Sequence, residues 1–172
     1  MTFPMPREKK VIQKEDIIPL DVYFEKRREL RKNIVNLKKN RSIALGPYAT
    51  FYFESYETIL AQVQEMLYIE KSGDEQLQDE LSAYNSLIPN GKELTATLMF
   101  EIDNPILRAA FLGKVCGIEK TVFMKINGEK IKAASEEDID RSYTEGKASS
   151  VQFIRFNFTE DLISKFHTNG QK

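Results

Sequence analysis

Apolar and polar residues recur along this chain with two different periods, which predict helices and strands in a mixed order. Between residues 21 and 39 the apolar residues fall at intervals of seven, four and three, the spacing of one helix face. Between residues 94 and 102 they occupy alternate positions, which predicts a strand with Thr95 and Thr97 pointing outward. The same patterns predict helices at 55–70, 75–87 and 105–115, a short helix opening at Ser135, a last helix after Thr159, and strands at 41–45, 50–54, 121–126, 129–134 and 150–158.

Two of the expected connections are tight hairpin turns. Gly46-Pro47 lies between the first two strands, and Asn127-Gly128 is the dipeptide that a two-residue hairpin favours. Strands and helices mix without the strict alternation of a parallel sheet. The sequence therefore predicts an α+β fold, with a mainly antiparallel sheet of about six strands and helices packed on one face.

Aromatic residues and methionine also fall on the second face of several expected strands. The set is Phe51, Phe53, Met99, Phe123 and Phe153. A sheet with apolar side chains on both faces needs a second cover, either further helix or another subunit. We therefore expect a homo-oligomer.

Composition favours one core with a separate amino-terminal leader. The chain has 172 residues, of which 41% are hydrophobic. Residues 1–14 are polar and contain two prolines, so we expect a flexible leader there and a single α+β domain at residues 15–172.

The net charge of −1 hides an asymmetry along the chain. Residues 1–41 carry twelve Lys or Arg against six Asp or Glu, and the remainder carries thirteen against twenty. A basic arm of this kind either contacts nucleic acid or is a solvated helix face, and we favour the solvated face. The candidate nucleic-acid contacts are Lys26, Arg27, Arg28, Arg31, Lys38, Lys39 and Arg41.

Other features bear on the cellular setting. No run of about 18 apolar residues occurs, so no membrane partner is expected, and the first residues lack the pattern of a signal peptide. Cys116 is the single cysteine, and its apolar neighbours favour a small core residue over a reactive thiolate. The sequence thus predicts a protein of the reducing cytoplasm.

Several chemistries lack the residues they require. His167 is the single histidine, which leaves no histidine–cysteine set for a zinc or iron–sulfur site and no supported nucleophile–base pair. The eight glycines match no phosphate-binding spacing. We expect no metal and no cofactor, and the balance is against an enzyme.

Carboxylate and amide side chains remain as candidates for a site. Arg41 begins the first hairpin strand and Glu54 ends the second, while Gln62 and Glu65 follow on the next helix, off its apolar stripe together with Gln64. Convergence of these side chains gives either a polar pocket for a small ligand or carboxylate chemistry, or an Arg–Glu pair linking hairpin to helix. The ligand-binding candidates are Arg41, Glu54, Gln62, Glu65 and Arg155.

Several motifs together resemble a known family. They are N-R-S-I-A-L-G-P with the following residues to Glu70, L-S-A-Y-N-S-L-I-P-N-G from Leu81, G-I-E-K from Gly117 and S-S-V-Q-F-I-R-F from Ser149. With these motifs the chain resembles the bacterial family called domain of unknown function 3501. The resemblance implies a one-domain bacterial protein whose gene neighbours encode rubrerythrin-like and iron–sulfur oxidoreductase proteins, and hence a redox or peroxide-stress setting.

The resemblance brings no catalytic residue with it. Lys38 and Gln152 stand where members of that family tend to carry histidine, which disfavours a histidine-dependent activity here. Our leading hypothesis is an accessory or interaction protein that self-associates and works with a redox partner. The alternatives are the small-ligand binder or enzyme around the polar cluster and, third, nucleic-acid binding through the basic helix.

Overall fold

The computed structural model describes residues 10–70, 74–126, 128–135 and 148–168 of the chain. The chain forms two compact units that alternate along the sequence. The first unit combines Met1–Ser42 with Phe53–Pro89, and the second combines Ile43–Tyr52 with Asn90–Lys172.

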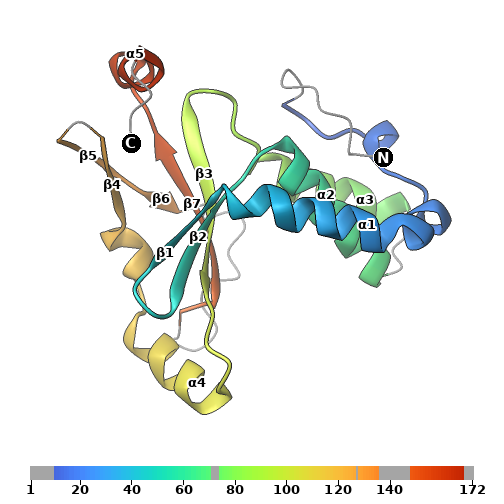
Figure 1. The fold of residues 1–172 in the computed structure, drawn as a ribbon, viewed down its shortest axis with the longest axis horizontal. Coiled ribbons are helices and arrows are strands. Elements are labelled where there is room, and N and C mark those ends of the chain that lie inside the picture. Colours follow the sequence, from blue (N-terminus) through green and yellow to red (C-terminus); the bar gives the residue numbers. More distant parts are fainter. Residues whose placement is uncertain (1–9, 71–73, 127, 136–147, 169–172) are drawn as a thin grey trace. The chain divides into compact units, whose positions relative to one another are not determined.

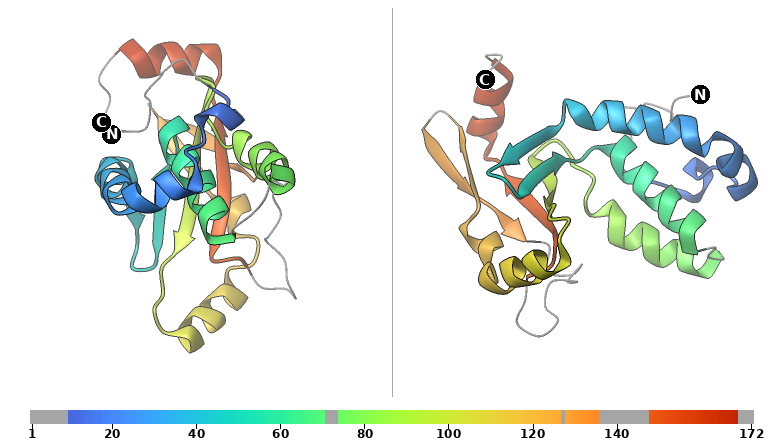
Figure 2. Two further views of the ribbon diagram at one scale, coloured as in Figure 1. Left: turned by 90° about the vertical axis from the view of Figure 1, so that its right-hand side faces the viewer. Right: turned by 60° about the horizontal axis from the view of Figure 1, so that its bottom comes forward.

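Three helices make up most of the first unit: α1 (Leu20–Lys39), α2 (Tyr56–Glu70) and α3 (Asp74–Asn85). α2 packs against α1 on one side and against α3 on the other, as the ribbon views show (Figures 1 and 2). The helices lie where the apolar periodicity predicted them. Their most buried apolar side chains, which form the core of this unit, are Tyr23, Leu30, Ile59, Leu60 and Val63.

The amino-terminal segment (residues 12–18) is attached to the helices by two carboxamide side chains. Asn85 accepts a hydrogen bond from the Ile12 amide at 2.8 Å and donates one to the Ile12 carbonyl at 3.1 Å. Gln64 makes the same pair of bonds with Ile18, at 2.8 and 2.9 Å. Each amide thus pairs with the main chain as a neighbouring strand would.

Two observations concern the predictions for this region. Gln64 was expected off the apolar stripe, but it is fully buried because the main chain of Ile18 satisfies both of its polar atoms. Residues 1–9 of the predicted leader lie outside the described residues. In residues 10–14, the described part of the predicted leader, Ile12 is buried, and a short 3-10 helix begins at Lys14.

The second unit is built on a five-stranded sheet with the order β1-β2-β3-β7-β6. β3 runs antiparallel to β7, with Leu98 opposite Gln152, and β6 is also antiparallel to β7. These strands are β1 (Ser42–Leu45), β2 (Ala49–Phe53), β3 (Glu93–Phe100), β6 (Ala134–Ser135) and β7 (Val151–Asn157). The predicted α+β class and mainly antiparallel sheet are confirmed.

The remaining described elements of this unit are short. β4 (Phe123–Ile126) and β5 (Glu129–Lys132) form a separate antiparallel hairpin, preceded by a 3-10 helix at Ile118–Thr121. α4 (Pro105–Lys114) follows β3, and α5 (Glu160–Thr168) follows β7. The strand predicted at 121–126 therefore starts two residues late, because the 3-10 turn takes its first residues.

The central strands are buried more completely than alternation predicted. Thr95 and Thr97 are 1% and 4% exposed, although they were expected to point outward. Both faces of β3 are thus covered at its centre, and periodicity alone does not reveal such double burial. Ser135, where a short helix was expected to open, belongs to β6, and the rest of that predicted helix lies outside the described residues.

Within the described ranges, no helix combines the length and the apolar character needed to cross a bilayer.

Candidate functional site

A single carboxylate, that of Glu65 on α2, gathers side chains from α1. The Arg27 guanidinium binds it with two hydrogen bonds, Nη2 to Oε1 at 2.5 Å and Nε to Oε2 at 3.1 Å. The Tyr23 hydroxyl donates to Oε2 at 2.8 Å, and Arg31 Nη1 donates to Oε1 at 3.3 Å. The carboxylate therefore has a complete set of donors, and the bidentate Arg27 contact is its strongest.

The electrostatics of this network keep Glu65 ionised. The hydrogen bond from Arg27 lowers the pKa of Glu65, Tyr23 adds to the effect, and partial burial opposes it. Burial, together with the hydrogen bond to Glu65, raises the pKa of the Tyr23 hydroxyl, so it stays a donor. A carboxylate that is ionised and fully hydrogen-bonded is a poor general base, and these contacts favour binding or structure over proton transfer.

An aromatic cluster surrounds the same arginine. The Arg27 guanidinium lies over the Tyr68 ring, 4.7 Å from its centroid. Tyr68 also packs edge-on against Tyr23 at 5.7 Å and stacks with Phe24 at 6.3 Å between ring centroids. Arg27 therefore lies between a carboxylate and an aromatic face, and it links α1 to α2.

Next to this network, a groove of about 210 Å³ opens between α1 and α2. Aliphatic side chains and polar groups share its walls. Two of the predicted site residues, Gln62 and Glu65, belong to it. The lining residues are Tyr23, Leu30, Arg31, Ile34, Val35, Lys38, Thr58, Ala61, Gln62 and Glu65.

Arg41 and Glu54 also lie together, but their contact runs through the main chain. Arg41 Nε donates to the Phe53 carbonyl at 3.1 Å, and Nη2 donates to the Glu54 carbonyl at 3.0 Å. The buried Glu54 carboxylate accepts a hydrogen bond from the Thr58 hydroxyl in the first turn of α2. Arg41 thus fixes the main chain where the hairpin leads into α2, and Glu65 binds Arg27 rather than the predicted Arg41.

Arg155, the last predicted site residue, belongs to the second unit. It lies on β7 opposite Thr95, with its guanidinium 3.7 Å from the buried carboxylate of Glu93. The described contacts therefore place Arg155 in a cross-strand pair of the sheet.

The partners of Glu65 were missed because Arg27 and Arg31 were assigned to the solvated basic face of the first helix. A signal was available, since Tyr23, Arg27 and Arg31 recur at every fourth residue and must share one side of α1. The basic face is therefore partly turned inward, and two of its cations bind a carboxylate of the acidic body.

Other candidates for chemistry contribute little to a site. Cys116 was expected in the core but is exposed, because it follows the end of α4, a helix without a buried residue. Among the described residues, no three His, Cys, Asp or Glu side chains are grouped so that they would hold a metal ion.

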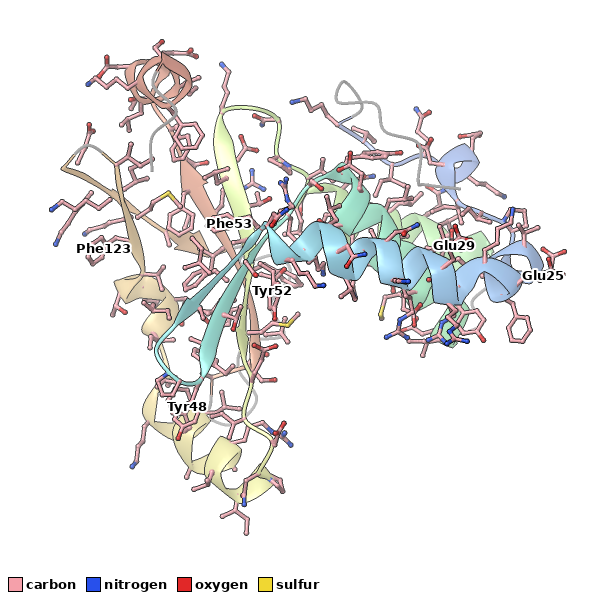
Figure 3. All side chains as sticks on the ribbon, viewed as in Figure 1. Glu25, Glu29, Tyr48, Tyr52, Phe53 and Phe123 are labelled. Atoms are coloured by element: carbon pink, nitrogen blue, oxygen red, sulfur yellow. The ribbon has the colours of Figure 1, made fainter. Side chains whose placement is uncertain are left out.

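The second unit presents apolar side chains to solvent at one edge and one end of its sheet. Ile43 and Leu45 on the edge strand β1 are 57% and 63% exposed, and Ile106 on α4 is 78% exposed. Tyr48, in the β1–β2 turn, packs its ring edge-on against Phe111 of α4 at 5.5 Å and lies beside that helix (Figure 3). We call Ile43, Leu45, Tyr48, Ile106 and Leu107 the apolar surface.

The fold and its polar cluster define a small α+β protein with a helical unit, a sheet unit and a groove between two helices. Residues 11–172 match the family described as "Protein of unknown function (DUF3501)", and the chain belongs to that family. A solved structure described as a novel protein of unknown function from Burkholderia pseudomallei K96243 is similar, with a TM-score of 0.83 and 35% identity. The match covers 91% of this chain and 81% of that one. No curated protein matches the chain.

Proposed function

We propose that this protein is an accessory or interaction protein that self-associates and exerts its function through binding rather than catalysis. The observation that carries the proposal is the apolar surface of the second unit. Exposed apolar side chains are common singly, but on an open strand edge they favour association.

The edge strand β1 provides the means of association. β1 stands at the end of the strand order, and its sequence Ser-Ile-Ala-Leu contains no charge and no proline. Edge strands that must stay free usually carry lysine, proline or a bulge, because their main-chain groups otherwise pair with another strand. β1 contains neither lysine nor proline.

A second copy of this chain is the proposed occupant. An antiparallel pair of β1 strands about a two-fold axis brings Ile43 and Leu45 of each copy against the same residues of the other. Ile106 and Leu107 are further exposed apolar residues of the same unit, on α4, a helix without a buried residue. The assembled protein then binds a redox protein. The family resemblance, which implies a redox or peroxide-stress setting, supports this part of the proposal.

Sedimentation velocity at micromolar concentration tests self-association. We expect a species of twice the 19.9 kDa chain mass for the native protein. Leu45→Lys introduces a charge on the edge and is expected to give the monomer, whereas Ile69→Lys, at an equally exposed position on α2, keeps the dimer. A native protein that sediments as a monomer overturns the proposal, as does a dimer that survives Leu45→Lys.

Co-sedimentation tests the redox partner. The purified protein is mixed with a rubrerythrin-like protein from the same host, and a joint boundary at micromolar concentration is expected. Separate boundaries contradict the proposed redox partner but do not bear on self-association, which the first experiment tests.

A further inference from the structure

The groove between α1 and α2 has the composition of a binding site for a small amphiphilic molecule. Leu30, Ile34 and Ala61 supply an aliphatic wall, and Gln62 supplies an amide. Ligand sites commonly combine an apolar lining with few polar groups that fix orientation. The volume of about 210 Å³ is below the usual range of ligand pockets, about 300–1,000 Å³, so the groove suits only a small molecule.

The charges around the groove favour an anion. Glu65 is the carboxylate of the lining, and Arg27 neutralises it with a bidentate contact. Arg31 then adds a positive charge at the same end of the groove. Lys38 adds another to the lining, while the buried Glu54 carboxylate, bound to the lining residue Thr58, offsets one of these charges. A negatively charged group beside Arg31 therefore enters a region of positive potential.

Arg31 also keeps hydrogen-bonding capacity. A guanidinium has five N–H donors, and the described contact of Arg31 is a single hydrogen bond of 3.3 Å to a carboxylate that Arg27 and Tyr23 already bind. The Arg31 side chain is 60% exposed, so it can turn toward a ligand without unfolding the helix pair. A carboxylate ligand would accept a bidentate pair from it.

From this arrangement we propose that the groove binds a small aliphatic carboxylate. The anionic group of the ligand binds Arg31, and its hydrocarbon part lies along Leu30, Ile34 and Ala61. The Gln62 amide, one helical turn before Glu65 on α2, also lines the groove. This proposal concerns the first unit and is independent of self-association through the apolar surface.

Titration with hexanoate, followed in two-dimensional NMR spectra of the full chain, tests the site. We expect shifts that saturate and that concentrate on α1 and α2, while hexanamide, which has the same hydrocarbon part and no charge, causes none. The absence of saturable shifts with hexanoate overturns the proposal, and equal shifts with hexanamide overturn the role of charge.

Two variants and a matched control locate the ligand. Arg31→Gln is expected to weaken hexanoate binding at least about tenfold, the effect of losing a charge-assisted hydrogen-bond pair. Arg28→Gln removes the same charge from an exposed position of α1 outside the lining and is expected to leave affinity nearly unchanged. Ala61→Leu fills the aliphatic wall and is expected to abolish binding.

Circular dichroism spectra of each variant verify that the helices persist. An Arg28→Gln protein that loses as much affinity as Arg31→Gln points to a diffuse charge effect and contradicts the proposal. Undiminished binding in both Arg31→Gln and Ala61→Leu places the ligand elsewhere and contradicts it too.

Discussion

Glu65 shows how one side chain can serve two helices. Its carboxylate receives hydrogen bonds from Tyr23, Arg27 and Arg31, all of which lie on α1. The position was a predicted site residue because a long polar side chain near an apolar stripe needs partners. The sequence did not show which arginine would be the partner, because the rotation of α1 about its axis depends on the packing of both helices.

Glu65→Gln keeps the shape of the side chain and removes its charge. We expect this variant to lower the free energy of unfolding at pH 7 by about 1 kcal/mol, the usual value for weakened hydrogen bonds at a partly exposed site. The pKa of Glu65 is lowered in the folded state, so the stabilisation exists above the unfolded pKa and disappears as pH falls through the folded pKa.

Urea unfolding of both proteins between pH 7 and pH 2 measures this difference. The two curves should begin to converge as pH falls below the pKa of a free glutamate, about 4.3, and should meet only below the lower folded pKa. Glu25→Gln, on the exposed beginning of α1 (Figure 3), is the matched control and should follow the native protein throughout. Equal stability of Glu65→Gln and native protein at pH 7 would show that the network is not structural.

At the scale of elements, β7 carries a polar residue on its core-facing side. Gln152 alternates with the buried Ile154 and Phe156 and is 7% exposed. Its Nε2 reaches the Ser149 carbonyl at 3.5 Å, while its Oε1 has no hydrogen-bond partner in the described part of the chain. A buried oxygen without a donor is costly, so this strand is less stable than an apolar one would be.

Gln152→Met replaces the amide with an apolar side chain of similar length. We expect it to raise the free energy of unfolding by about 1 kcal/mol, since the desolvation cost disappears and the volume is kept. Thermal unfolding measures the change, and Gln78→Met on the exposed side of α3 should stay within about 0.5 kcal/mol of the native protein. A clear loss of stability in Gln152→Met would reveal a bound water or another partner at this oxygen.

The positions of most elements could be predicted because each has a clear period and clear end signals. Asn104 caps α4 by accepting from the Ile106 and Leu107 amides, with Pro105 at the first helical position, as its sequence suggested. The exceptions have physical causes. Thr95 and Thr97 are buried, although they are polar, because both faces of β3 are covered at its centre. The 3-10 turn at Ile118–Thr121 shortens the next strand without changing its apolar pattern.

For the whole molecule, part of the uneven distribution of charge along the sequence is paired within the fold. Arg27 and Arg31, which belong to the basic first part of the chain, bind Glu65 of the acidic remainder. Contacts between distant parts of a sequence are difficult to predict from periodicity, which explains why the fold was predicted better than the candidate site. The site required the pairing of α1 with α2, and local patterns do not specify that pairing.

The bidentate pairing of Arg27 with Glu65 weakens the case for a nucleic-acid surface on α1. Binding to nucleic acid depends on releasing counterions from phosphates, and cations that already bind carboxylates contribute less to it. We expect no shift in gel titrations with single- or double-stranded RNA and DNA at low salt, up to tens of micromolar protein (roughly the range of non-specific binding). A salt-sensitive shift that Lys38→Gln or Lys39→Gln weakens would contradict this expectation.

The carboxamide pairing of Asn85 with Ile12 has a consequence for the lifetime of the protein. Asparagine side chains hydrolyse slowly to aspartate, and the product would present a carboxylate where Asn85 now donates to the Ile12 carbonyl. The carboxylate would still accept from the Ile12 amide, but it would repel the Ile12 carbonyl, so this anchor would lose one of its two hydrogen bonds while the Gln64 anchor would persist. Hydrolysis of this one amide would thus weaken, without removing, the attachment of residues 12–18 to the helices.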